Sequence, residues 1–591
     1  MTSPKQTNKL GAMMRSLNKY YVKFIIAIIL LIVAVVMMIL TPGAIRDMTN
    51  AISPNNKQAV DGRFVVDMMQ VAAIGGKLVL LIGLAFAANA ISGFILNTSI
   101  QKYSRDLRDQ ISKKINKMPL NYFDTRQIGD ILSVVTNDVD MLATSLQSSI
   151  TTLIQSGVLL FGVLIAMFTA SWQLALVTVA SLPIMLVILG VTFSVAIPLF
   201  DKTQTTLGEV NAVVEESYSG QLIIKAFNAE SRKIGEFAEK NNFLGSMLYK
   251  SQGIGNLVEP AMNLVSYVTY AAALVVAGLL YTSGKIHDLG IITGFLLYIS
   301  LFQEPLVQIG QISGIIQQGT AACNRVFAFL EEEELDDEAE KTGKLDHDHI
   351  RGEVEFKNVY FGYDPSKATI KNFSEKVKPG MKVAIIGPTG AGKTTLVNLL
   401  MRFYETTSGD ITVDGVSIHD MSRHELREIF GMILQETWVI NGTLRENIVY
   451  NLENVEEERL NKILEETNLA HYVSTLPDGL DTVIQKESAL SAGQKQLVTI
   501  ARAMAENAPM IILDEATSNI DTRTEILIQN ALDALTKGRT SFVIAHRLST
   551  IKNADLIIVM KDGNIVETGT HDSLMELGGL YKEIYNSQFN N

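Results

Sequence analysis

A glycine-rich loop is the strongest chemical signal in the chain. Residues 387–394 read G-x-x-x-x-G-K-T and lie between an apolar strand pattern and a helical pattern. In such a loop the backbone N–H groups can close around phosphate oxygens, and the following helix N-terminus adds positive potential. Lys393 is expected to contact the β- and γ-phosphates, and Thr394 to ligate Mg²⁺. The motif predicts a nucleotide site formed by Gly387, Thr389, Gly390, Gly392, Lys393, Thr394 and Thr395.

Two adjacent acids follow a second apolar strand pattern. Ile511–Leu513 is uninterrupted aliphatic sequence, and Asp514 and Glu515 come directly after it. Asp514 is expected to hold Mg²⁺, directly or through water, and Glu515 to polarise the attacking water as general base. Many strands end in acids, so the pair is a weak signal alone. Together with the phosphate loop it predicts nucleoside triphosphate hydrolysis.

The first half of the chain carries long uncharged runs that would tie this chemistry to a membrane. Of 591 residues, 47% are hydrophobic and only 19% are charged, below the roughly 25% usual for soluble proteins. The run Met141–Phe200 contains no Asp, Glu, Lys or Arg. At ~1.5 Å per residue it can cross a ~30 Å hydrocarbon core twice. The pattern predicts six spanning helices near residues 24–44, 70–97, 146–168, 173–199, 257–281 and 288–310.

Composition excludes several other classes. The positive mean hydropathy of +0.21 argues against a purely soluble enzyme and against a disordered chain. The formal net charge of −12 disfavours a general nucleic-acid binder. Cys323 is the only cysteine, which rules out an internal disulfide framework and a cysteine-cluster metal site. We expect it to be an ordinary reduced thiol.

Charge in the loops predicts the orientation. Lysines and arginines gather before the first span and in residues 102–117, whereas the loops near 170 and 283 are short and nearly uncharged. The positive-inside rule then places both termini in the cytoplasm. The inner segments 102–145 and 201–250 are long, polar and helix-patterned, so we expect ordered helices that reach beyond the bilayer.

The sequence therefore predicts an all-α six-helix transmembrane domain fused to an α/β P-loop ATPase domain. The expected order is a cytoplasmic segment 1–23, a transmembrane domain 24–325, an acidic linker 326–350 and a nucleotide-binding domain 351–591. The acidic run Glu331–Glu340 marks the boundary and is interpreted as a solvated linker.

Further motifs give the second half a family resemblance. Leu490–Gln494 resembles the LSGGQ signature of ATP-binding cassette (ABC) proteins and precedes Asp514, as that family requires. By the same resemblance Tyr363 stacks on adenine, Gln435 is the Q-loop glutamine that also binds Mg²⁺, Asp521 belongs to the D-loop and His546 is the switch histidine. The inner loops around Phe123 and Phe227 resemble the coupling segments of six-helix ABC exporters, near 122–128 and 225–232.

The resemblance also implies a mechanism and a partner. In this family the phosphate loop of one subunit faces the signature motif of the other, so Ser491, Gly493 and Gln494 are expected to act in trans. Two nucleotides close the ATPase domains, and hydrolysis by Glu515 with His546 resets an alternating-access cycle. The chain is thus expected to be a half-transporter in the cytoplasmic membrane.

One departure from the family pattern bears on the dimer. The signature has Ala492 where a glycine is usual, and residues 485–489 lack a glycine common there. With Glu515 and His546 intact, this resembles the catalytically complete subunit of heterodimeric bacterial multidrug exporters. A heterodimer is expected. The alternative is a homodimer in which Ala492 is a tolerated small residue.

The substrate signal is sparse. Glu259 and Glu304 lie within or near spans, where a charge is costly and therefore suggests function. They could attract amphipathic cations, which predicts export of amphipathic drugs (multidrug efflux). The alternatives are that both acids reach the headgroups or pair within the bundle, that the substrate is a lipid or peptide, or that the chain is a regulatory membrane ATPase.

Overall fold

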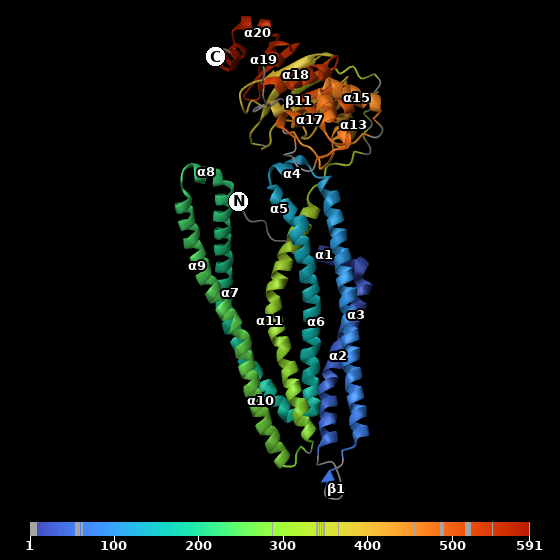
Figure 1. Ribbon diagram of the computed structural model, residues 1–591, viewed down its shortest axis with the longest axis vertical. Coiled ribbons are helices and arrows are strands. Elements are labelled where there is room, and N and C mark those ends of the chain that lie inside the picture. Colours follow the sequence, from blue (N-terminus) through green and yellow to red (C-terminus); the bar gives the residue numbers. More distant parts are fainter. Residues whose placement is uncertain are drawn as a thin grey trace. The chain divides into compact units, whose positions relative to one another are not determined.

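The computed structural model divides into two units that follow the two halves of the sequence (Figure 1). The first unit, called here the membrane unit, is Met1–Asn116 with Ile128–Glu332, and the second, the ATPase unit, is Lys117–Gln127 with Glu333–Asn591. The structure describes the whole chain except residues 1–8, 54–58, 61–62, 65, 287, 339–340, 342, 344, 347–348, 365, 436, 453–454, 485–489, 515–521, 546–547 and 590–591.

Long helices make up the membrane unit. The six expected spans are confirmed, since six helices in the described residues are long and apolar enough to cross a bilayer. The helices α3, α6, α7 and α11 each run well past the expected span at one end, because the polar flanking sequence continues the helix. The elements are α1 Leu10–Ser16, η1 Leu17–Tyr20, α2 Tyr21–Ile52, α3 Met68–Ile115, α5 Ile128–Ser133, α6 Val139–Ala170, α7 Trp172–Ser219, α9 Glu230–Asn256, α10 Val258–Thr282 and α11 Leu289–Glu331, with short strands β1 Ala59–Val60 and β2 Arg63–Phe64 between α2 and α3.

The polar segments 102–145 and 201–250 are ordered helices, as expected from their pattern. A π-helical turn, Val134–Asp138, joins α5 to α6. The short helices α4 (Leu120–Asp124) and α8 (Gln221–Ala226) each start a few residues before the expected coupling segments. The helix α11 runs to Glu331, so residues 326–331 are its last turns and not the beginning of a linker.

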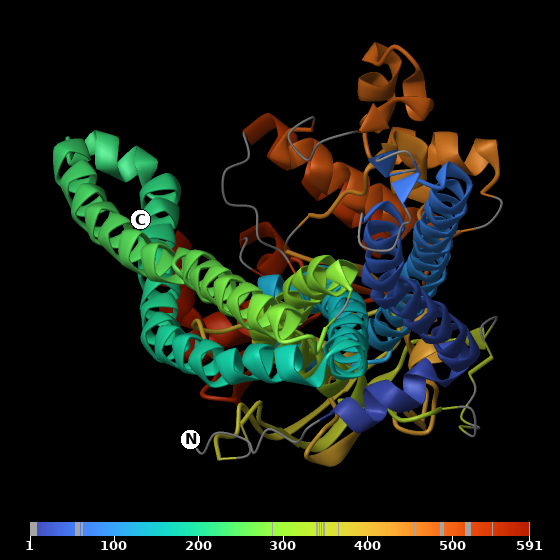
Figure 2. The same ribbon diagram turned by 90° about the horizontal axis from the view of Figure 1, so that it is seen from below.

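Two sets of helices pack within the membrane unit. The helices α2, α3, α6 and α11 lie against one another, and α7 pairs with α9 and α10. The view along the helices shows α7 and α9 running side by side, with α8 between their ends (Figure 2). Near the C-terminal end of α11, Arg325 donates to both carboxylate oxygens of buried Asp138, at 2.8 and 2.5 Å. Cys323 is fully buried, with its Sγ 3.8 Å from Sδ of Met13.

Two sheets form the centre of the ATPase unit. A six-stranded sheet has the order β14-β13-β5-β12-β11-β8, and a four-stranded antiparallel sheet has the order β4-β3-β6-β7. The strands are β3 Val354–Phe361, β4 Ile370–Val377, β5 Lys382–Ile386, β6 Ser408–Val413, β7 Val416–Ser417, β8 Phe430–Ile433, β9 Gly442–Thr443, β10 Val483–Ile484, β11 Met510–Asp514, β12 Thr540–Ile544, β13 Leu556–Lys561 and β14 Asn564–Gly569.

Alternation along the central strands separates two cores. Ala384 and Ile386 face a core shared with the helices α14 to α18, whereas Val383 and Ile385 face the core under the four-stranded sheet. The helices are α12 Lys393–Leu400, α13 Arg423–Glu428, α14 Leu444–Val449, α15 Glu457–Glu466, α16 Leu469–Thr475, η5 Gly479–Asp481, α17 Ala492–Glu506, α18 Thr522–Thr536, α19 Leu548–Lys552, α20 His571–Leu577 and α21 Leu580–Phe589. The predicted fold class, an all-α membrane domain fused to an α/β ATPase domain, is confirmed.

Candidate functional site

The register of the parallel strands brings the predicted nucleotide residues to one edge of the sheet. Ile544 pairs with Ile385 on one side and with Asp514 on the other, and Leu513 pairs with Ile433. The carboxyl ends of β5, β12, β11 and β8 therefore lie in a row. Parallel α/β sheets bind ligands at this edge, because the loops that follow the strands converge there.

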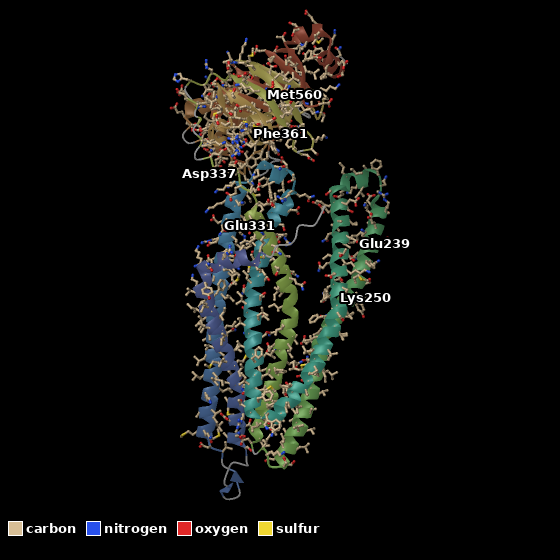
Figure 3. All side chains as sticks on the ribbon, turned by 180° about the vertical axis from the view of Figure 1, so that it is seen from behind. Glu239, Lys250, Glu331, Asp337, Phe361 and Met560 are labelled. Carbon is tan, nitrogen blue, oxygen red and sulfur yellow. The ribbon has the colours of Figure 1, made fainter. Side chains whose placement is uncertain are left out.

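The phosphate loop begins where β5 ends. Gly387 has φ +154° and Gly392 has φ +100°. A Cβ on Gly387 would collide with the carbonyl oxygen of Met560, which is labelled in Figure 3, and one on Gly392 would lie 2.7 Å from Cδ1 of Ile370. Both positions therefore require glycine. The loop leads directly into α12, whose first residue is Lys393.

Lys393 lies over its own loop. Its ammonium donates to the carbonyl oxygens of Gly387 at 2.8 Å and Pro388 at 3.2 Å. Burial lowers the pKa of Lys393, and the carboxylate of Asp514 acts in the opposite direction. A partly desolvated cation at a helix N-terminus gains strongly from a phosphate oxygen, so the residues present fit a nucleoside triphosphate.

Tyr363 lies beside the phosphate loop with an accessible ring. Its hydroxyl donates to Oγ1 of buried Thr395 at 3.2 Å, and 45% of the residue is exposed. Its ring meets those of Phe361 and Tyr404 edge-on, with centroids 5.0 Å away in both cases. Phe361 is labelled in Figure 3. These contacts fix the plane of the ring, which suits an aromatic that stacks on a base.

Oxygen donors suited to Mg²⁺ follow the strands that end at the same sheet edge as the phosphate loop. Asp514 ends β11, the exposed Gln435 follows the neighbouring strand β8, and Thr394 lies exposed in the first turn of α12. Hydroxyl, amide and carboxylate oxygens are ligands that Mg²⁺ accepts, usually completed by phosphate and water. Within the described residues no group of three or more His, Cys, Asp or Glu could hold a metal ion by itself.

Several predicted residues fall outside the described part of the chain. They are Glu515, Asp521, His546 and the segment 485–489. The strands that precede Glu515 and His546 are β11 and β12, neighbours in the sheet.

The signature segment forms a capped helix start. Ser491 accepts from the backbone N–H of Gln494 at 3.2 Å, and the Gln494 side chain accepts from the N–H of Ser491 at 2.9 Å. This capping box presents the exposed Ser491 and Ala492 at the N-terminus of α17, while Gly493 is buried. Ala492 is the first helical residue, so its backbone conformation does not require glycine.

The two acids proposed for the substrate site have different surroundings. Glu304 accepts from Nε2 of Gln308 at 2.9 Å, and the Gln308 oxygen accepts from Ser156 at 2.9 Å, which ties α11 to α6. Glu259 lies exposed in the first turn of α10. No partner of Glu259 occurs among the described residues.

One acid in the expected linker is not solvated, contrary to the sequence interpretation. The Glu338 side chain is only 14% exposed and lies 3.0 Å from Nη1 of Arg402 and 2.8 Å from Nη1 of Arg423. Burial raises the pKa of Glu338, but the backbone N–H of Arg423 and both guanidinium charges outweigh it and hold that pKa below its usual range. Sequence reasoning missed this residue because its neighbours are also acidic and its partners are more than sixty positions away.

The comparisons agree with the geometry. A family model described as "ABC transporter transmembrane region" matches residues 24–306, and one described as "ABC transporter" matches residues 370–518. The chain belongs to the ABC transporter family, and its C-terminal half is an ATP-binding, ATP-hydrolysing domain of the ABC type.

Relatives that are named for different substrates resemble the chain over most of its length. A "Fatty acid ABC transporter ATP-binding/permease protein" of Mycobacterium tuberculosis is 41% identical, over 87% of this chain and 81% of that protein. An "ATP-dependent lipid A-core flippase" of Syntrophus aciditrophicus is 34% identical over 83% and 81%. A "Probable multidrug resistance ABC transporter ATP-binding/permease protein" of Bacillus subtilis is 34% identical over 88% and 77%.

A solved structure matches nearly the whole chain. It is a bacterial Atm1-family ABC exporter with ATP bound, 26% identical, with a TM-score of 0.74 over 97% of this chain and 98% of that one. The chain is therefore a multi-pass membrane protein with the exporter arrangement of one transmembrane and one ATPase domain.

Proposed function

We propose that the chain is one half of an ATP-driven exporter that moves amphipathic molecules across the cytoplasmic membrane by alternating access. The observation that carries the proposal is the edge of the six-stranded sheet. There β5 leads to Lys393, β11 ends at Asp514 and β8 is followed by Gln435, in a chain that also has six apolar helices. The loop charges support an orientation with both termini in the cytoplasm.

The roles of the nucleotide residues follow from their positions. Lys393 neutralises the β- and γ-phosphates. Thr394, Asp514 and Gln435 would hold Mg²⁺, which would supply positive charge to the phosphate oxygens. Tyr363 carries the base. Glu515 is the general base, His546 contacts the γ-phosphate, and Asp521 belongs to the D-loop. Gly387, Thr389, Gly390, Gly392 and Thr395 shape the loop.

We propose that the functional unit is a dimer and that the partner is a different half-transporter. Ser491, Gly493 and Gln494 then meet a nucleotide held by the partner. The extra methyl of Ala492 lies at the exposed helix start that the phosphate must approach. The homodimer is the second candidate, and the helical backbone of Ala492 favours it, since alanine fits that conformation without strain.

Mg²⁺-ATPase activity of the chain purified alone in lipid separates the two dimers. An active, stable dimer of this chain supports the homodimer. Activity no higher than that of Glu515→Gln, restored by co-expression with a second half-transporter, supports the heterodimer. Sustained turnover by Glu515→Gln would contradict the assignment of the general base.

For the substrate we propose an amphiphile with a hydrocarbon part, and two head groups are candidates. Exposed Glu259 favours a cationic drug. The 41% identity to a protein named as a fatty acid transporter favours a carboxylate lipid. Inside-out proteoliposomes given a lipophilic fluorescent cation or a fluorescent fatty acid distinguish them. ATP-dependent uptake of neither, with ATPase activity intact, would contradict export of either class.

A further inference from the structure

Four consecutive residues after the phosphate-loop helix collect contacts from two distant parts of the chain. The helix α12 ends at Leu400, and Arg402, Phe403, Tyr404 and Glu405 follow; we call Arg402–Glu405 the α12 cap. Its contacts reach α4 and the linker Glu333–Glu338, which belong to the same unit. These are the segments by which the ATPase unit is covalently joined to α3, α5 and α11.

Arg402 anchors the cap in an unusual conformation. It has φ +52° and is 4% exposed, and its N–H donates to Leu399 O at 3.0 Å. Its guanidinium donates to the carbonyl oxygen of Met421 at 2.9 Å and to Glu405 at 3.0 and 3.1 Å. A buried arginine held in the left-handed region persists only where the surroundings determine it, so the helix end is firmly held.

The linker attaches to the cap through Glu338. Its Oε1 lies 3.0 Å from Nη1 of Arg402, and its carboxylate also accepts from the backbone N–H of Arg423 at 2.6 Å. Arg423 in turn donates to Glu405 at 2.5 Å. Two carboxylates and two guanidinium groups thus form one network, in which the linker supplies one acid and the cap supplies the other.

The helix α4 attaches to the cap through Tyr404. The Tyr404 hydroxyl donates to a carboxylate oxygen of Asp124, the last residue of α4. Burial raises the pKa of Tyr404, and the neighbouring Asp124 raises it further, so the hydroxyl keeps its proton. On its other side the Tyr404 ring contacts the rings of Tyr363 at 5.0 Å and Phe361 at 5.5 Å.

The two attachments also meet each other. The N–H of Leu335 in the linker donates to the carbonyl oxygen of Lys117, just before α4, at 2.7 Å. The Lys117 ammonium lies 3.6 Å from Glu334. A displacement of the cap therefore acts on two segments that are themselves hydrogen-bonded.

We propose that the α12 cap is the positioning element through which nucleotide at the phosphate loop acts on both chain connections, with Tyr404 holding α4 and Arg402 holding the linker. The proposal rests on the proposed nucleotide site. Phosphates bind at the first residue of α12 and the cap follows its last turn, so a short rigid helix carries the displacement. A base stacked on Tyr363 acts on Tyr404 through the ring contact.

Hydrogen–deuterium exchange of the full chain in lipid nanodiscs tests the proposal. The probe is Mg²⁺ with the non-hydrolysable analogue AMP-PNP. In the wild type we expect nucleotide to slow exchange in both α4 and the linker. Tyr404→Phe removes only the hydroxyl donor. It should abolish the slowing of exchange by nucleotide in α4, an effect of about tenfold, because one hydrogen bond to a charged group is lost. The slowing in the linker should remain. Glu338→Gln should abolish the effect in the linker alone.

Matched variants and a binding measurement make the outcome decisive. Tyr360→Phe removes an exposed hydroxyl in the same unit, and Glu333→Gln removes an exposed linker acid; both should behave as wild type. Binding of a fluorescent ATP analogue should be unchanged in all four variants. Wild-type protection of α4 in Tyr404→Phe and of the linker in Glu338→Gln overturns the proposal. Failure of the wild type to bind nucleotide would instead overturn the proposed function, and this inference with it.

Discussion

The two units place their apolar side chains in opposite ways. In the membrane unit, Phe161 and Ile165 of α6 are 67% and 66% exposed, while Val163 between them is fully buried. In the ATPase unit the strands β5, β11 and β12 bury almost every side chain. Both units therefore have a packed interior, and they differ in what their surfaces meet.

The difference reflects two solvents. An exposed stripe of Phe and Ile would be unfavourable in water, whereas hydrocarbon receives it without cost. Burial of apolar area drives folding of the ATPase unit, because removing that area from water lowers the free energy. In lipid this driving force between helices is missing, so close packing and polar contacts such as Ser156–Gln308 must hold the bundle. Each unit should accordingly respond to different substitutions.

The largest expected effect is the loss of ATPase activity when the phosphate-loop lysine of the ATPase unit is replaced. Lys393→Ala removes the cation that contacts the phosphates, and loss of one such group typically lowers turnover by roughly 10²–10³-fold. We expect ATPase activity in lipid to fall by that factor. The exposed Lys378 of the same unit provides the control, and Lys378→Ala should retain activity. A fall of less than about threefold for Lys393→Ala would contradict its assigned role.

A matched pair of phenylalanines compares the two solvents directly. Phe373 is fully buried and its ring centroid lies 5.0 Å from that of Phe356, whereas Phe161 faces outward from α6. Phe373→Ala should destabilise the ATPase unit by about 3–5 kcal/mol and lower its melting temperature by roughly 10 °C. Phe161→Ala should change stability by less than about 1 kcal/mol, because lipid refills the space. Scanning calorimetry in nanodiscs measures both, and equal losses would refute the comparison.

The smallest effect concerns the linker acid and depends on pH. Glu338→Gln should destabilise the ATPase unit by about 1–3 kcal/mol at pH 7, since hydrogen bonds to charged groups are lost. Folding holds the pKa of Glu338 below its usual value. Its contribution is therefore complete above the unfolded-state pKa of about 4.3 and disappears as pH falls through the lower folded-state pKa.

Melting curves of wild type and Glu338→Gln across pH check this sign. The gap between them should be widest near neutral pH and close in acid. Glu333→Gln, which removes an exposed acid of the same linker, should melt like the wild type at each pH. A gap that widens in acid would contradict the ion-pair account.

Features that depend on residues close together in the sequence were predictable. The phosphate loop and the strand before Asp514 are local patterns, and placing them at one sheet edge needed only that both strands be parallel members of the same sheet. The six spans followed from uncharged runs. Their ends did not, because hydropathy reports where a helix leaves hydrocarbon and not where it stops, and α7 continues to Ser219.

Contacts between distant residues were not predictable. Glu338 belongs to an acidic run in which every residue looks equally solvated, and only the fold brings Arg402 and Arg423 to it. Tyr404 and Asp124 are 280 positions apart, and no sequence motif predicts that they are in contact. The substrate acids are a similar case, since composition alone could not indicate that Gln308 donates a hydrogen bond to Glu304.

The burial of Cys323 has a practical consequence for studying motion. The chain carries no other thiol, and this one is fully enclosed beside Met13. Maleimide dyes and spin labels should not react with this thiol, so the natural sequence should remain unlabelled. A cysteine placed at an exposed position such as Tyr218, which is 83% accessible, would take up a probe alone. The transport cycle could then be followed by distance spectroscopy without first rebuilding the interior.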